Sequence, residues 1–172
     1  MLKITTLVNG LHRDGPNDRR PEGRAGKRQK SVRTVQACFD SGASGHCCSE
    51  ATLFGHIRYY ESPKLVTDAG GTQHDIIGVG DIPMLCQTTD GNEQLITYQD
   101  VALAPTLTAG MYVDTTRLRT RYGWTCMGDK NRMHWQCDKG FTFNLSVREG
   151  LEYLDGKPAA RMHQAQLFAL GQ

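Results

Sequence analysis

The sequence contains no run of about 18 apolar residues, the length that a membrane-spanning helix requires. Polar side chains interrupt residues 2–11, so this stretch does not have the pattern of a signal peptide. Charge of neither sign dominates, with 20 Lys and Arg against 18 Asp and Glu. These absences predict a soluble, intracellular protein without a membrane partner, and 172 residues predict one ordinary domain rather than a large multidomain enzyme.

Cysteine occurs six times, but without the spacing of a disulfide scaffold. The chain has no Cys-x-x-Cys, and adjacent cysteines such as Cys47 and Cys48 seldom bind one tetrahedral ion together. We therefore expect reduced thiols, no metal and no cofactor. Two alternatives stay open: a zinc-dependent nucleic-acid-binding module using His46 with Cys47, Cys48, Cys126 and Cys137, or a Cys nucleophile paired with His46. We expect His46 to be a structural hydrogen-bonding residue instead.

Positive charge is concentrated near the N-terminus. Between residues 12 and 33 there are eight Lys and Arg against three Asp and Glu, a local net charge of +5. Apart from Ala25 and Val32 this stretch has almost no apolar side chains, so burial cannot offset the entropy lost on ordering it. We expect residues 1–33 to form a disordered basic linker. Weak RNA contact through phosphate groups is the alternative role for this segment.

From residue 35 onward, short apolar stretches alternate with turn residues. Such stretches are typical of strands, and the turn residues at 68–71 and 90–92 are typical of hairpins. Short helices are expected at 49–54, 115–122 and 158–170. The chain is therefore predicted to be all-β apart from short helices. The strand-length stretches are 35–39, 65–67, 76–79, 82–85, 95–98 and 101–103.

The first of these strands leads into Asp40-Ser41-Gly42-Ala43-Ser44. A carboxylate placed just after a buried strand and followed by small residues is what aspartic proteolysis requires. In that interpretation Asp40 holds the attacking water, and Gly42 lets the backbone approach and offers its amide to the carboxylate. Ser41 would hydrogen-bond across a dimer axis, and Ala43 is small because a partner chain passes close. The same residue types are common in solvent-facing turns, so the pentapeptide alone leaves an ordinary turn open.

Only one Asp-Ser/Thr-Gly tripeptide occurs in the chain. An aspartic protease needs two carboxylates that share one proton, one acting as base on water while the other protonates the carbonyl oxygen. The interpretation therefore requires a symmetric homodimer in which Asp40 of both copies meets at a two-fold axis. Because the two carboxylates titrate as a pair, activity is expected to peak at mildly acidic pH.

A peptide-cleaving cleft also needs a lid that binds an extended substrate through its backbone. Asp68-Ala69-Gly70-Gly71-Thr72 is the candidate flap, because its paired glycines permit the positive φ angles of a tight, movable turn. An ordinary exposed hairpin is the alternative.

Motifs in a fixed order extend this pattern over residues 35–155. After Asp-Ser-Gly-Ala-Ser come His46 and the Leu-Phe pair at 53–54. Next are the hairpin at 66–72, an Ile-Gly-Val-Gly strand at 77–80, Val-x-x-x-Pro-x-Leu at 101–107 and Leu-Glu-Tyr-Leu at 151–154. This succession resembles the protease of copia-type LTR retrotransposon Gag-Pol polyproteins. The chain departs from the family at 47–49 and 110–113, where Cys-Cys-Ser and Gly-Met-Tyr-Val replace the usual residues.

The resemblance implies a retropepsin-like acid protease fold: a closed, β-barrel-like subunit with one Asp-Ser-Gly loop and a homodimeric active site. The implied activity is an aspartic endopeptidase that processes a Gag-Pol polyprotein inside cytoplasmic virus-like particles. The expected organisation is a linker at 1–33, the protease domain at 34–150 and a tail at 151–172 leading toward a downstream segment. The alternative is an inactive or host-adopted copy that serves as a dimerising or RNA-associated particle component.

Overall fold

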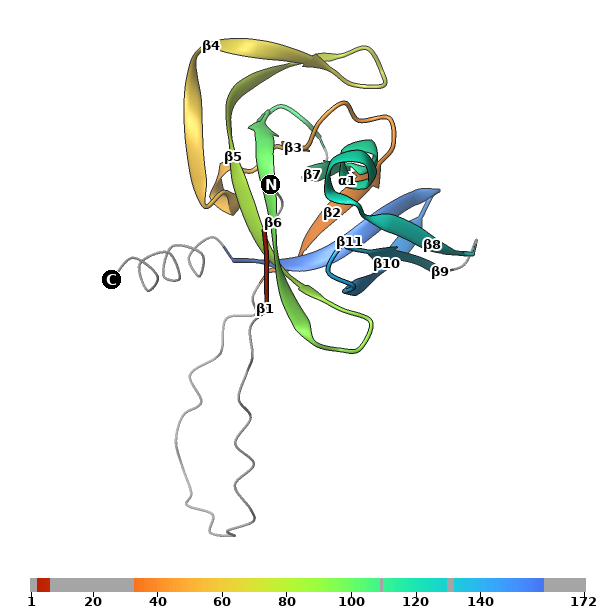
Figure 1. The fold of residues 1–172 in the computed structure, drawn as a ribbon. Coiled ribbons are helices and arrows are strands. Elements are labelled where there is room, and N and C mark those ends of the chain that lie inside the picture. The colour runs from red at the N-terminus through yellow and green to blue at the C-terminus, as the bar shows by residue number, and fades with distance from the viewer. Residues whose placement is uncertain (1–2, 7–32, 109, 130–131, 160–172) are drawn as a thin grey trace, which may run out of the picture.

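The computed structural model describes residues 3–6, 33–108, 110–129 and 132–159 (Figure 1). Within these residues, strands make up most of the structure, accompanied by a short α-helix and a 3₁₀ helix, which confirms the predicted all-β class. In chain order the elements are β1 (Lys3–Thr6), β2 (Val35–Asp40), β3 (Cys47–Cys48), η1 (Ala51–Leu53), β4 (His56–Thr67), β5 (Gln73–Gln87), β6 (Glu93–Leu103), β7 (Met111–Asp114), α1 (Thr115–Tyr122), β8 (Thr125–Asp129), β9 (Arg132–Gln136), β10 (Thr142–Arg148) and β11 (Leu151–Pro158).

The strands form one strongly bent sheet in the order β4-β5-β6-β3-β7-β2-β11-β10-β9-β8, and β1 pairs with β6. β11 pairs with β2 and also with β5, so the sheet from β5 through β2 to β11 returns on itself. Such closure pairs strand edges that would otherwise be exposed. The result is a barrel-like arrangement, with the β4–β5 hairpin at the top of the view in Figure 1 and β8 to β10 projecting at the right.

The β5 and β6 strands are longer than their apolar stretches predict. Segments 76–79 and 82–85 are parts of the one strand β5, and 95–98 and 101–103 are parts of β6. The apolar pattern breaks where the register between them shifts, and there Asp100 adopts a positive φ of 55°. The predicted turns at 68–71 and 90–92 do connect antiparallel strands, β4 to β5 and β5 to β6.

Aromatic packing from the C-terminal strands supports the element that carries Asp40. Phe39 lies on β2, and its ring centroid is 5.4 Å from that of Trp135 on β9. Trp124 stacks on Phe143 at 5.6 Å, and all four side chains are buried. Since Phe39 directly precedes Asp40, this packing fixes where β2 ends and where the Asp40 loop begins.

The predicted boundary at residue 150 is wrong. Leu151–Pro158 form β11, which is hydrogen-bonded to β2 and β5, and Leu154 is buried in the core. The family resemblance places this stretch in a tail leading toward a downstream segment, and nothing in its own residues indicates the long-range pairing with β2 and β5. Residue 158 likewise ends a strand rather than beginning a helix, and the rest of the helix predicted at 158–170 lies outside the described residues after residue 159.

The N-terminal prediction also needs a correction. Residues 1–33 were expected to be disordered, but Lys3–Thr6 form β1, antiparallel to β6. Residues 7–32, which hold seven of the nine Lys and Arg of residues 1–33, lie outside the described part of the chain. No helix in the described residues is both long and apolar enough to cross a membrane.

Gly80 allows β4 to approach β5 unusually closely. A Cβ atom on Gly80 would overlap the His56 carbonyl oxygen, closer than any real contact. Because the obstructing atom belongs to the backbone, the two strands would have to separate to admit a side chain. We expect Gly80→Ala to lower the free energy of unfolding by about 2–3 kcal/mol, measured by urea denaturation.

Gly110→Ala is the matched control, because a Cβ atom there meets nothing within 4 Å. It should change the unfolding free energy by less than about 0.5 kcal/mol. Equal stability of the two variants would contradict the tight packing of β4 on β5.

Candidate active site

Asp40 is the last residue of β2, at the point where the buried strand opens into a loop. β2 lies parallel to β7, and Asp40 is aligned with Asp114. The Asp40 carboxylate is half-buried, and its Oδ1 atom accepts a hydrogen bond of 2.7 Å from the Gly42 amide. This is the contact that the sequence predicts for Gly42. A Cβ on Gly42 would lie 3.3 Å from that same oxygen, so a side chain there would crowd the carboxylate.

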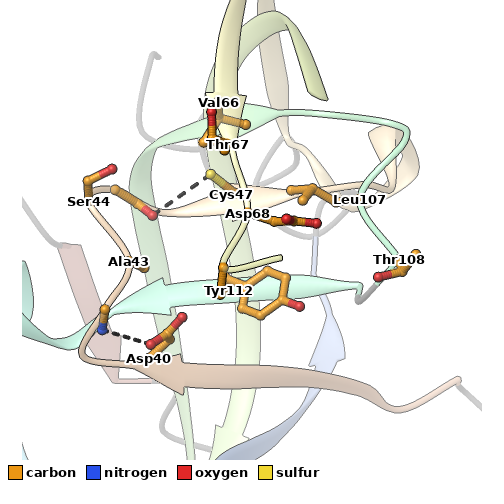
Figure 2. A pocket seen from close by; sticks show the side chains of 13 residues that line it. Asp40, Ala43, Ser44, Cys47, Val66, Thr67, Asp68, Leu107, Thr108 and Tyr112 are labelled. Carbon is orange, nitrogen blue, oxygen red and sulfur yellow. Dashed lines mark hydrogen bonds between the residues drawn. The ribbon is translucent and has the colours of Figure 1, made fainter. Parts of the chain in front are cut away.

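Asp40 faces a pocket of about 340 Å³ (Figure 2). The pocket is formed by three segments that are far apart in the sequence: the Asp40 loop with the start of β3, the β4–β5 hairpin, and the loop between β6 and β7 with the start of β7. In Figure 2 Asp40 lies at the bottom, Val66 and Thr67 lie at the top, and Tyr112 of β7 lies between them. The lining residues are Asp40, Gly42, Ala43, Ser44, Gly45, Cys47, Val66, Thr67, Asp68, Ala69, Leu107, Thr108 and Tyr112.

The structure brings only part of the predicted site together. From the two predicted segments, Asp40, Gly42, Ala43, Ser44, Asp68 and Ala69 line the pocket. Four predicted residues do not line it: Ser41, Gly70, Gly71 and Thr72. Ser41 is exposed beside the loop, while the other three lie in the exposed turn of the hairpin.

Several pocket residues were not predicted as site residues. Tyr112 contributes an aromatic ring from β7, Cys47 a thiol from β3, and Leu107 and Thr108 a further wall. Burial, followed by the nearby Cys38 and Asp40, raises the pKa of Tyr112, so its hydroxyl stays protonated. Tyr112 lies outside the strands predicted from the sequence, and no local signal indicates that β7 runs beside the Asp40 loop.

The hairpin tip is stabilised by its own side chains. Asp68 Oδ1 accepts a 2.8 Å hydrogen bond from the Thr72 amide, and Gly71 adopts a φ of 84°. Asp68 Oδ2 lies 3.1 Å from Nε2 of His74. These hydrogen bonds lower the pKa of Asp68, and the one with His74 has the largest effect. The Asp68 carboxylate is therefore ionised at mildly acidic pH.

His46 lies behind the Asp40 loop as a buried, neutral side chain. Its Nδ1 atom accepts a 3.0 Å hydrogen bond from the backbone amide of Asp114. The carboxylate of the same residue caps α1. Burial, together with the charge of Arg117, lowers the pKa of His46 to about 4. His46 thus joins β3 to the start of α1, in line with the structural role expected from the sequence.

The cysteines beside His46 lack the features of an activated nucleophile. Burial raises the pKa of the Cys47 thiol, and it raises that of Cys48 to about 11. A thiol attacks as a thiolate, which these environments disfavour. The Nδ1 atom of His46 is also occupied by the Asp114 amide. All six cysteines are free, and the described residues contain no group of three or more His, Cys, Asp or Glu side chains placed to hold a metal ion.

The comparison with protein families covers the strands and loops that form this pocket. Residues 38–112 match the Pol polyprotein beta-barrel domain. This match supports the conclusion that the chain derives from a Pol polyprotein. Every residue that lines the pocket lies within the matched range, whereas α1 and β8 to β11 lie beyond it. No curated protein and no solved structure shows a significant match to the chain.

Proposed function

We propose that this chain is the aspartic endopeptidase of a copia-type retrotransposon Gag-Pol polyprotein. The observation that carries the proposal is the placement of Asp40: a half-buried carboxylate at the end of a buried strand, held by the Gly42 amide and facing a hairpin across a pocket. In the proposed reaction the carboxylate removes a proton from a water molecule, which attacks the peptide carbonyl carbon. A second carboxyl group protonates the carbonyl oxygen to give a tetrahedral intermediate. The C–N bond of this intermediate then breaks: the amine nitrogen takes the proton that was removed from water, and the second carboxylate recovers its proton as the carbonyl group re-forms.

The second carboxyl group has to be identified, because Asp68 lines the same pocket. Both oxygens of Asp68 are engaged by the chain itself, Oδ1 with the Thr72 amide and Oδ2 with His74. Its lowered pKa keeps it ionised, so it is poorly suited to share a proton with Asp40. The second carboxyl group is better supplied by Asp40 of another copy, which makes the proposed enzyme a symmetric homodimer.

The remaining parts of the proposal concern substrate and setting. The β4–β5 hairpin would act as the flap over an extended polyprotein segment. The enzyme would work in cytoplasmic virus-like particles, and the basic residues before residue 33 would make weak contacts with RNA phosphates. The alternative, a non-catalytic particle component that dimerises, would share the fold and leave Asp40 without a chemical task.

Self-processing is the direct test. The chain, extended by its natural upstream sequence, is incubated at pH about 5 and 7 with and without pepstatin, a transition-state analogue of aspartic proteases. We expect cleavage to be faster at the lower pH and to be inhibited by pepstatin. At concentrations where the dimer dissociates, the cleavage rate should rise more steeply than linearly with enzyme concentration. A folded dimer by sedimentation that fails to cleave would favour the non-catalytic alternative.

The folded state has to be verified at the acidic pH. His46 is neutral in the folded chain with a pKa of about 4, against an ordinary value of 6.5. Below pH 6.5 the unfolded chain therefore binds more protons at this residue, and stability falls as the pH decreases toward 4. Circular dichroism at both pH values separates lost folding from lost catalysis.

A further inference from the structure

A buried histidine links two walls of the pocket that are distant in the sequence. His74 lies on β5 just after the hairpin turn, and its side chain is 6% exposed. Its Nε2 atom is 3.1 Å from Asp68 Oδ2 at the hairpin tip. Its Nδ1 atom is 3.0 Å from Thr106 Oγ1, in the loop between β6 and β7. Both ring nitrogens are therefore used to join one segment to the other.

We propose that His74 positions the β4–β5 hairpin over the Asp40 pocket by tying the hairpin tip to the loop that carries Thr106. This role in peptide binding rests on the proposed function. His74 itself does not line the pocket, so it is a positioning residue rather than a catalytic one.

The placement of the two partners explains why the link matters. Asp68 lines the pocket from the hairpin, and Thr106 directly precedes Leu107 and Thr108, which line it from the other side. β4 is an edge strand whose side chains are mostly exposed, so beyond its backbone pairing with β5 it has little side-chain packing to hold it in place. The His74 ring joins this hairpin to the opposite wall of the pocket.

The hydrogen bonds can be separated experimentally. A neutral imidazole with its proton on Nε2 donates to Asp68 and accepts from the Thr106 hydroxyl at Nδ1. Thr106→Val removes the hydroxyl with almost no change of shape, at an exposed residue where folding is not at risk. His74→Ala removes both links, and His74→Gln restores a side chain that can donate and accept.

Hydrogen exchange of the hairpin amides in residues 66–72 measures the tie without reference to catalysis. We expect the hairpin amides of Thr106→Val to exchange about three- to tenfold faster than those of the unsubstituted chain, which is the effect of losing one net hydrogen bond. His74→Ala should exchange faster still, and His74→Gln should recover part of the protection. Thr89→Val makes the same chemical change on the exposed β5–β6 turn and should leave the hairpin amides unchanged.

Peptide cleavage then tests positioning. We expect Thr106→Val to raise KM about three- to tenfold while kcat stays within about twofold, because the hairpin holds substrate and does not take part in proton transfer. If the hairpin amides exchange at the unsubstituted rate in both Thr106→Val and a folded His74→Ala, then His74 does not hold the hairpin to the Thr106 loop. Faster exchange with an unaltered KM would overturn its role in substrate binding. If the unsubstituted chain cleaves no peptide, the proposed function fails. The hydrogen-exchange rates still show whether His74 holds the hairpin to the Thr106 loop.

Discussion

Asp40→Asn is expected to lower the rate of peptide cleavage at least about a thousandfold. An asparagine amide cannot take a proton from water, and in a homodimer the single substitution removes both members of the carboxyl pair. The fold should persist, because the asparagine side-chain oxygen can still accept the hydrogen bond that Asp40 Oδ1 receives from the Gly42 amide at 2.7 Å. The rate is measured as self-processing, with the thermal unfolding midpoint as the check on folding.

Asp138→Asn is the matched control, an identical change at an exposed aspartate that does not line the pocket. Its cleavage rate should equal that of the unsubstituted chain. Adding excess Asp40→Asn to the unsubstituted chain should inhibit cleavage, because mixed dimers contain one carboxyl group instead of two. Cleavage that persists in purified Asp40→Asn would show that Asp40 is not the catalytic acid. Absence of inhibition on mixing would argue against an active site shared by two copies.

A chain that ends at residue 150 is expected not to fold. It lacks β11, which pairs with β2 along 152–156 and with β5 along 156–158, and which therefore closes the sheet. It also loses the buried side chain of Leu154 and the 2.7 Å hydrogen bond from Trp135 Nε1 to Glu152 Oε2. These losses should remove most of the about 5–15 kcal/mol that stabilises an ordinary domain.

A chain that ends at Ala159 is the comparison, because it keeps β11 and the 3.0 Å hydrogen bond from the Ala159 amide to the Pro83 carbonyl. We expect it and the full chain to unfold cooperatively in urea, whereas the chain ending at residue 150 should show no cooperative transition. Cooperative unfolding of the shorter chain at the same midpoint would mean that β11 is dispensable, as the predicted boundary at 150 assumed.

The sequence by itself determined the elements whose causes are local. α1 begins and ends where it was expected, because the Asp114 carboxylate accepts a hydrogen bond from the Arg117 amide at one end and Gly123 adopts a left-handed conformation at the other. The hairpin turns at 68–71 and 90–92 follow from their own Asp, Gly and Asn residues. The loop at Asp40 and its contact with the Gly42 amide were likewise readable from adjacent residues.

Tertiary structure decided everything that depends on pairing across the chain. β4 is an exposed edge strand without an apolar pattern, and β11 belongs to the fold through β2, more than a hundred positions earlier in the sequence. The pocket walls from Leu107 and Tyr112, and the link from His74 to Thr106, have the same origin. Local residue preferences report how a segment bends, but which segments meet is set by closure of the sheet around one shared core, a property of the whole chain.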